Sequence, residues 1–113
     1  MDLNKIKRAG DAVILPFPSG RPNEAGRRGF SDVLMALARE GKCKRIVIDL
    51  VETTWFSSID LGVLAFALRE CNQRNIALML ARVNKQALRV FEVTRMNAVF
   101  SMYDTVEEAL GTG

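Results

Sequence analysis

The chain has 113 residues and a formal net charge of +3, with 49% hydrophobic and 26% charged residues. This length fits a single domain, residues 1–113, and the composition is that of a globular chain and not of a disordered one. The longest apolar run, residues 61–68, is far too short to cross a membrane, and the charged first ten residues lack the apolar segment of a signal peptide. We therefore expect a cytoplasmic protein without membrane insertion.

The cysteine and histidine content restricts the chemistry that this chain can perform. Cys43 and Cys71 lie 28 residues apart without a CxxC motif, and the chain contains no histidine. This usage argues for a reduced compartment and against a zinc site. A Ser-His-Asp triad is impossible, and the commonest general base is absent. The sequence thus predicts no catalytic residue, no metal and no cofactor, and two small, partly buried thiols.

Positive charge is concentrated in the first part of the chain. Residues 1–45 hold ten Lys and Arg against five Asp and Glu, whereas residues 46–113 hold six against eight. Such a basic segment can bind an acidic partner or nucleic acid. No aromatic residues are interleaved with these charges, so we expect a solvated surface and no nucleic-acid binding.

The first half of the chain predicts two strands and one helix. Pro16 marks the end or the sheet edge of the first strand. A loop rich in proline and glycine follows it. Apolar residues at helical spacing then indicate a helix that Gly41 ends. The next strand is apolar on both faces, as in a buried central strand. In chain order, the predicted elements are a strand at 12–17, a loop at 18–26, a helix at 31–40 and a strand at 45–51.

The second half of the chain also predicts strands and helices in alternation. Asn84 is a candidate N-cap, with Leu88, Phe91 and either Val90 or Thr94 on the apolar face of its helix. Asp104 and Glu107 have the spacing of a capping box, and Gly111 provides a stop. The predicted elements are a helix at 58–73, strands at 76–81 and 98–100, and helices at 84–94 and 104–110. Alternating strands and helices predict an α/β domain with a mainly parallel or mixed sheet flanked by about four helices.

The segment KRIVIDLVETTWFSSIDLGVL, residues 44–64, resembles the STAS domain of bacterial anti-sigma factor antagonists. In that family a buried strand ending in Asp-Leu leads to a helix that starts Asp-Ser-Ser-Gly-Leu-Gly. The similarity continues through ALMLARVNKQALRVFEVTRMNAVFSMYDTVEEAL and is weaker before Cys43. It implies a STAS-like fold and a non-enzymatic domain that binds partner proteins, typically an anti-sigma factor of the serine-kinase type. Phosphorylation of a serine at the helix start switches such binding.

Aligning the helix start residue by residue shows departures from the family pattern. Leu61 and Gly62 match the final Leu-Gly, and Asp49 matches the acid at the end of the strand. Ser58 matches the first serine of the family's pair, but Ile59 occupies the position of the usual phosphoacceptor. Asp60 replaces a glycine, and Ser57 replaces the preceding aspartate. These departures bear on the phosphoswitch more than on the fold.

The Ser57-Ser58 pair has three interpretations. Ser57-x-x-Asp60 has the spacing of a helix cap, with Ser57 or Ser58 as the N-cap. A phosphate on Ser58 or Ser57 would meet free backbone N–H groups and the positive end of the helix dipole, although Asp60 would repel it. Alternatively, Asp60 itself supplies a fixed negative charge where the family adds one. A nucleophilic serine would need a base, and no lysine lies between Lys44 and Lys85.

The helix at 58–73 carries two apolar stripes. Its inward side is expected to hold Leu61, Leu64, Leu68 and Cys71. A second stripe, Ile59, Val63 and Phe66, lies nearly opposite and indicates either partner docking or cover by a neighbouring helix. We therefore predict a partner-binding surface made of Ser57, Ser58, Ile59, Asp60, Gly62, Val63 and Phe66.

Two other groups of residues each have two possible roles. Trp55 and Phe56 either contribute to a partner surface or pack under the loop before the helix. Arg82, Asn84 and Lys85 follow a strand, at the sheet edge that should also hold the serines, and can either bind a phosphate or remain solvated.

These observations predict a protein-interaction module of bacterial regulation, similar to an anti-sigma factor antagonist, that binds a kinase-type anti-sigma factor. The alternatives are a STAS subunit of another assembly, such as a sensory complex or a lipid-transport system, and a small nucleotide-binding or hydrolytic enzyme. No glycine-rich phosphate loop is present, which argues against the enzyme. The oligomeric state is left open.

Overall fold

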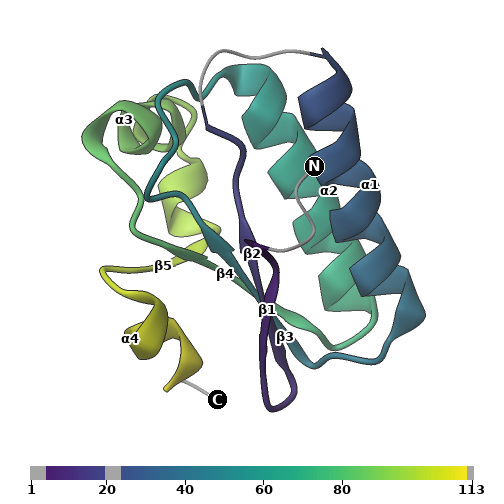
Figure 1. The fold of residues 1–113 in the computed structure, drawn as a ribbon. Coiled ribbons are helices and arrows are strands. Elements are labelled where there is room, and N and C mark those ends of the chain that lie inside the picture. Colours follow the sequence, from purple (N-terminus) through teal and green to yellow (C-terminus); the bar gives the residue numbers. More distant parts are fainter. Residues whose placement is uncertain (1–4, 20–23, 112–113) are drawn as a thin grey trace.

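The computed structural model describes residues 5–19 and 24–111 and contains one mixed sheet of five strands (Figure 1). The strands follow chain order across the sheet; β1 and β2 are antiparallel, and β2 to β5 run parallel. The strands are β1 (Lys7–Ala9), β2 (Ala12–Pro16), β3 (Arg45–Asp49), β4 (Ala77–Ala81) and β5 (Ser101–Tyr103). The helices in the described residues are α1 (Glu24–Glu40), α2 (Ser58–Gln73), α3 (Lys85–Val93) and α4 (Val106–Leu110), with a short 3-10 helix η2 (Met96–Ala98).

Strand alternation divides the apolar residues between two faces of the sheet. Ile46, Ile48 and Leu50 point into the main core, which also contains buried residues of α1, α2 and α3. Val47 points to the opposite face, where Met79, Ala81 and Ala109 of α4 form a second, smaller cluster. Both faces of β3 are therefore buried, which explains its continuous apolar sequence. Figure 1 shows α1 and α2 side by side on one side of the sheet and the short α4 on the other.

Several predicted elements agree with the structure. The α/β fold with a mostly parallel sheet and four helices is confirmed, and the helix at 58–73 is confirmed with the same bounds. Gly41 follows α1 with φ +69°, a left-handed conformation that suits glycine and ends the helix. Asn84 caps α3, because its side-chain oxygen accepts a hydrogen bond from the Ala87 N–H at 2.9 Å.

The first half of the chain differs from the prediction in two ways. Strand β1 was not predicted; it forms a hairpin with β2 through a two-residue turn in which Gly10 has φ +62°. Helix α1 begins at Glu24 and not at residue 31, so the loop predicted at 18–26 is wrong for residues 24–26. Residues 20–23 of that loop lie outside the described residues. Tertiary contacts of Phe30 and Arg27 extend the helix despite two glycines in its first turns.

The second half differs at its last strand and helix. The strand predicted at 98–100 is wrong: Ala98 ends η2, and β5 begins at Ser101. The last helix is capped by Thr105, whose hydroxyl accepts from the Glu108 N–H at 3.0 Å, so the predicted Asp104 cap is off by one residue. On α3, Val90 is half-buried and Thr94 is exposed, which selects Val90 for the apolar face.

Candidate functional site

The N-terminus of α2 is closed by a reciprocal capping box between Ser57 and Asp60. Ser57 is the N-cap with extended backbone dihedrals, and its Oγ accepts from the Asp60 N–H at 3.5 Å. Asp60 Oδ2 in turn accepts from the Ser57 N–H at 3.0 Å and from the Ser57 hydroxyl at 3.3 Å. The Ser-x-x-Asp prediction is thus confirmed, with Ser57 as the cap and Ser58 as the first helical residue.

Asp60 is buried and paired with an arginine of α1. Its residue exposure is 4%, and its Oδ1 lies 2.9 Å from Arg27 Nε. Arg27 also donates to the Trp55 carbonyl oxygen at 3.2 Å and lies over the Phe17 ring, with its guanidinium carbon 4.8 Å from the ring centroid. The Asp60 carboxylate is therefore turned inward and compensated by Arg27, which argues against the interpretation of Asp60 as a fixed negative charge in place of a phosphate.

The loop before α2 is held from the other side by α3. Asn84 donates through Nδ2 to the Thr53 carbonyl oxygen, and Gln86 Nε2 donates to the Phe56 carbonyl oxygen at 3.0 Å. Phe56 is buried and stacks on Phe91 of α3, with ring centroids 5.2 Å apart. Phe56 therefore packs under the loop, and Asn84 has a structural role in holding this loop and capping α3.

The outward side of α2 exposes the second apolar stripe, which we call the α2 stripe: Ile59, Val63 and Phe66. Ile59 is 78% exposed and Phe66 54% exposed, whereas Val63 is half-buried. The neighbouring helices therefore do not cover the stripe. Gly62 lies between these side chains and is exposed, and a Cβ atom placed there would meet no heavy atom within 4 Å.

The opposite side of α2 packs into the core as predicted. Leu61, Leu64 and Cys71 are buried, together with Ala67, and Leu68 is half-buried. Trp55, just before the helix, is 47% exposed, unlike its neighbour Phe56. Ser58 is exposed, and its hydroxyl makes no hydrogen bond among the described residues. Trp55, Ser58 and the α2 stripe are thus all at least partly exposed, and they lie just before α2 or in its first half.

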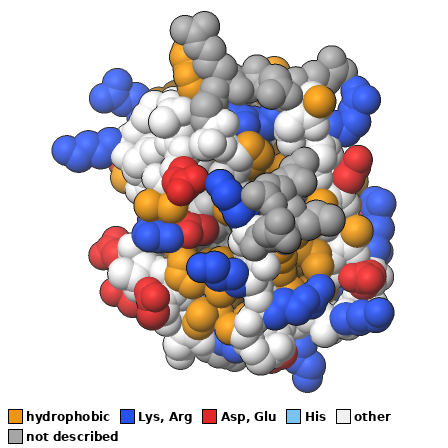
Figure 2. All heavy atoms as spheres, viewed as in Figure 1, with side chains coloured by type: hydrophobic (Ala, Val, Ile, Leu, Met, Phe, Trp, Pro, Cys, Tyr) orange, Lys and Arg blue, Asp and Glu red, His pale blue; other side chains and the backbone are white. Residues whose placement is uncertain are grey.

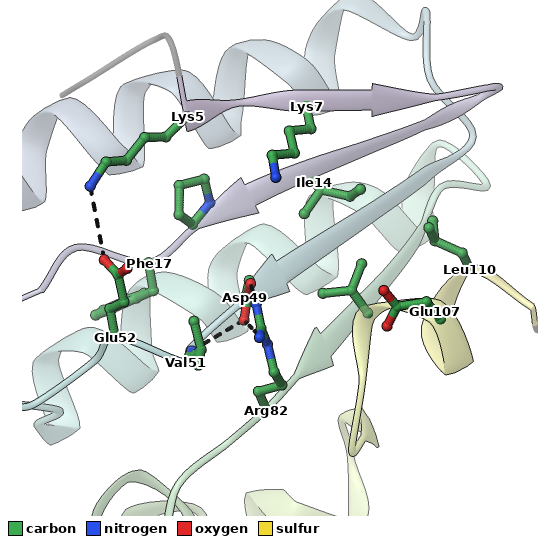
Figure 3. Close-up of a pocket in the computed structure, with 12 residues that line it drawn as sticks. Lys5, Lys7, Ile14, Phe17, Asp49, Val51, Glu52, Arg82, Glu107 and Leu110 are labelled. Atoms are coloured by element: carbon green, nitrogen blue, oxygen red, sulfur yellow. Dashed lines mark hydrogen bonds and ion pairs between the residues drawn. The ribbon is translucent and has the colours of Figure 1, made fainter.

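A second candidate site is a groove of about 540 Å³ between β1 and α4 (Figure 3). Two ion pairs line it: Arg82 Nε lies 3.0 Å from Asp49 Oδ1, and Lys5 Nζ lies 3.9 Å from Glu52 Oε2. The other lining residues are Lys7, Ile14, Pro16, Phe17, Val51, Val106, Glu107 and Leu110.

The charges of this groove do not favour a phosphate. Its three cations are matched by three carboxylates, and Arg82 is committed to Asp49 by two hydrogen bonds, which raise the pKa of Arg82 above its ordinary value. Lys85, the third residue of the predicted phosphate-binding loop, is exposed and does not line the groove. The groove therefore gives the nucleotide-binding alternative no support.

The structure also bears on metal ions, membranes and nucleic acid as partners. Within the described ranges, no group of three or more acidic, cysteine or histidine side chains could hold a metal ion. No helix in the same part of the chain is both long enough and apolar enough to cross a membrane. Figure 2 shows one face of the molecule, on which Lys and Arg side chains are scattered and acidic side chains gather on the side of α4. This face has no continuous basic surface of the kind that binds nucleic acid.

Comparison with known proteins identifies the family. The STAS domain model matches residues 25–109, and the chain belongs to this family. A proposed anti-sigma factor antagonist from Thermotoga maritima has a similar structure, with a TM-score of 0.82, 24% sequence identity, and coverage of 94% of this chain and 90% of that chain.

Two other solved structures share the fold at lower identity. An anti-sigma-factor antagonist (STAS) domain protein from Planctomyces limnophilus has a TM-score of 0.80 at 20% identity, covering 94% of this chain and 93% of that one. The phosphorylated form of the Bacillus cell fate determinant SpoIIAA has a TM-score of 0.76 at 15% identity, covering 95% and 96%. The chain is therefore a STAS domain that resembles anti-sigma factor antagonists.

Sequence reasoning named the residues around the N-terminus of α2, which remain a predicted partner surface, and it missed the residues that support this region. The predicted residues lie at the N-cap and in the first half of α2, with Asp60 buried: Ser57, Ser58, Ile59, Asp60, Gly62, Val63 and Phe66. Arg27 was missed because the loop prediction covered the residue just before it and no local pattern links it to Asp60, 33 residues away. Gln86 was missed for a similar reason, since it acts on a loop 30 residues earlier.

Proposed function

We propose that this STAS domain is a non-enzymatic interaction module of bacterial regulation, which binds an anti-sigma factor of the serine-kinase type in the cytoplasm. The observation that carries the proposal is the α2 stripe, with Ile59 and Phe66 exposed, on a helix whose opposite side packs into the core. The resemblance to anti-sigma factor antagonists supports the class of partner. Two free, buried cysteines are consistent with a reduced compartment.

The distribution of exposed apolar side chains supports docking at this end of α2. Six large hydrophobic residues are exposed in the described part of the chain, and three of them, Trp55, Ile59 and Phe66, lie just before α2 or in its first half. Aromatic side chains that are partly exposed on a rigid support make good anchors, because burying them gains apolar contact at a small cost in conformational entropy. A partner that covers Ile59 and Phe66 would remove both from water.

If a serine of this site is phosphorylated, we propose that it is Ser58. The Ser57 hydroxyl is engaged with Asp60 in both directions, so a phosphate there would break the capping box and lie beside a buried carboxylate. Ser58 is exposed, and as the first helical residue it is next to backbone N–H groups without intrahelical partners. Arg27 compensates the charge of Asp60, which reduces the repulsion expected from the sequence.

Phosphorylation of Ser58 would weaken partner binding in this proposal. A phosphate carries nearly two negative charges and is strongly hydrated. Placed next to Ile59, it would have to lose water when an apolar partner surface docks on the α2 stripe. The same reasoning explains how Ser58 can serve as a switch although the family's usual acceptor position holds Ile59 here.

The test is to capture partners of the full chain from its native cells and to identify them by mass spectrometry. We expect an anti-sigma factor with a kinase-type ATPase domain, and capture of transport or sensory-complex subunits instead would contradict this partner. Incubation with the captured kinase and ATP, followed by peptide mapping, then locates any phosphate. We expect phosphate on Ser58, with Ser58→Ala as the matched control; phosphate only on Thr94 or Thr105 would contradict the assignment.

A further inference from the structure

Arg27 connects α1 to three separate parts of the α2 end. Its Nε binds Asp60 in the capping box, its Nη2 binds the Trp55 carbonyl oxygen, and its guanidinium lies over the Phe17 ring. The Arg27 side chain is only 16% exposed, so it belongs to the support of the surface and not to the surface itself. One side chain thereby fixes both the helix start and the loop that precedes it.

We propose that Arg27 is a positioning residue that sets the geometry of the proposed docking surface from α1. Its effect on binding rests on the proposed function, whereas its effect on the local structure does not. Arg27 acts through Asp60 and the Trp55 carbonyl group, and the side chains that it orders are those of Trp55, Ser58 and Ile59.

The physical reason is the double role of the Asp60 carboxylate. Oδ1 binds Arg27 and Oδ2 binds the Ser57 N–H and hydroxyl, so a single inward orientation satisfies both partners. Without Arg27 a buried carboxylate is left unpaired, and it can regain solvation only by turning toward water. That movement releases the Ser57 N–H and opens the capping box, while the Trp55 carbonyl group loses the hydrogen bond from Arg27.

The other end of α2 provides a matched control. Arg39 of α1 pairs with Glu70 of α2, Nη2 to Oε1 at 3.1 Å, so it links the same two helices by an arginine–carboxylate ion pair whose arginine is more exposed than Arg27. It lies near the C-terminal turns of α2 and does not contact the capping box. A general loosening of the α1–α2 contact would therefore follow from loss of either arginine, but loss of surface geometry should follow only from loss of Arg27.

The experiment is amide hydrogen exchange measured by NMR on the full chain, for the wild type and for Arg27→Met, Arg27→Lys and Arg39→Met. The readout is the exchange rate of the Ser57 amide relative to that of Leu80 in the central strand β4, which reports global opening. We expect this ratio to rise in Arg27→Met and to stay at its wild-type value in Arg39→Met. Arg27→Lys should give an intermediate ratio, because one ammonium group can pair with Asp60 but cannot also hold Trp55 as a planar guanidinium does.

Equal acceleration of Ser57 and Leu80 in Arg27→Met would overturn the proposal, since Arg27 would then only add global stability. If Arg27→Met does not fold, Arg27→Lys decides, and a wild-type ratio in that variant would overturn the proposal as well. With the captured partner, Arg27→Met should lose about tenfold in affinity, less than an interface hot spot because Arg27 acts through other residues, and Arg39→Met should keep the wild-type affinity. The exchange readout needs no partner, so failure of the proposed function and failure of this inference are distinguishable.

Discussion

Arg39 of α1 and Glu70 of α2 form an ion pair in which Nη2 lies 3.1 Å from Oε1. Glu70 also accepts from Arg74, the C-cap residue just after α2, at 2.9 Å through its second carboxylate oxygen. The hydrogen bonds from Arg39 and Arg74 lower the pKa of Glu70 below its ordinary value, because both stabilise the charged form. The far end of the α1–α2 contact is therefore held by a charge that acid can remove.

The first prediction concerns the pH dependence of stability. The lowered pKa means that the folded chain binds the Glu70 proton less readily than the unfolded chain, so this contribution is present above the unfolded pKa and is lost as pH falls through the folded pKa. We expect Glu70→Gln to be slightly less stable than the wild type at neutral pH, and the difference to close on acidification. Urea unfolding over a pH series measures this; a difference that does not change with pH would contradict it.

The capping box predicts unequal effects of the two serines on stability. Ser57→Ala removes the N-cap hydroxyl and should lower the free energy of unfolding by about 1 kcal/mol. Ser58→Ala removes an exposed hydroxyl without a described partner and should change it by well under that amount. Chemical denaturation of both variants tests this difference. Equal losses would show that Ser57 is not the cap.

Thr53 offers a stabilising substitution. It is 1% exposed, and its Oγ1 is a buried side-chain atom without a hydrogen-bond partner among the described residues. Valine has the same shape without the unsatisfied hydroxyl, so Thr53→Val should raise the free energy of unfolding by about 1 kcal/mol. Thermal and urea unfolding measure the gain. A clear loss of stability would mean that the hydroxyl is solvated or bonded in the native state.

The cysteines should be unreactive in the folded chain. Burial raises the pKa of the Cys71 thiol to about 11, and burial also raises that of Cys43. Both thiols are therefore protonated near neutral pH, and thiolate is the reactive form. We expect slow reaction with an aromatic disulfide reagent in buffer and fast reaction of both cysteines in denaturant. Fast labelling of the native chain would contradict the burial of these residues.

The sequence was informative where the signal is local. The two apolar stripes of α2 are visible as helical periodicity, and the Ser57–Asp60 cap is visible as a three-residue spacing, so both could be predicted. The buried strands β3 and β4 were recognisable because apolar residues fill both of their faces. These features depend on neighbours within a few residues along the chain.

Features that depend on distant contacts could not be read from the sequence. The first turns of α1 contain two glycines and resemble a loop, and they are helical because Phe30 enters the core and Arg27 reaches Asp60 across 33 residues. Strand β5 starts at Ser101 and not at residue 98, because a turn and the short helix η2 precede it. Arg95 in that turn has φ +63°, a left-handed conformation that the sequence pattern did not predict. The inward carboxylate of Asp60 is bound by Arg27, 33 residues away, as well as by its neighbour Ser57, and only the contact with Ser57 is visible as a local spacing.

The central claim is that the α2 stripe is the docking surface, and one affinity measurement tests it most directly. The partner captured with the wild type is titrated with Phe66→Asp and with the control Val93→Asp, which changes an apolar residue on α3 that is even more exposed, at 78% against 54%. Both substitutions leave the core intact, so the melting temperatures should stay close to that of the wild type. We predict that Phe66→Asp loses about 30-fold or more in affinity, the scale of about 2 kcal/mol for an interface hot spot, and that Val93→Asp binds as the wild type does. Wild-type affinity for Phe66→Asp, in a folded protein, would contradict the account.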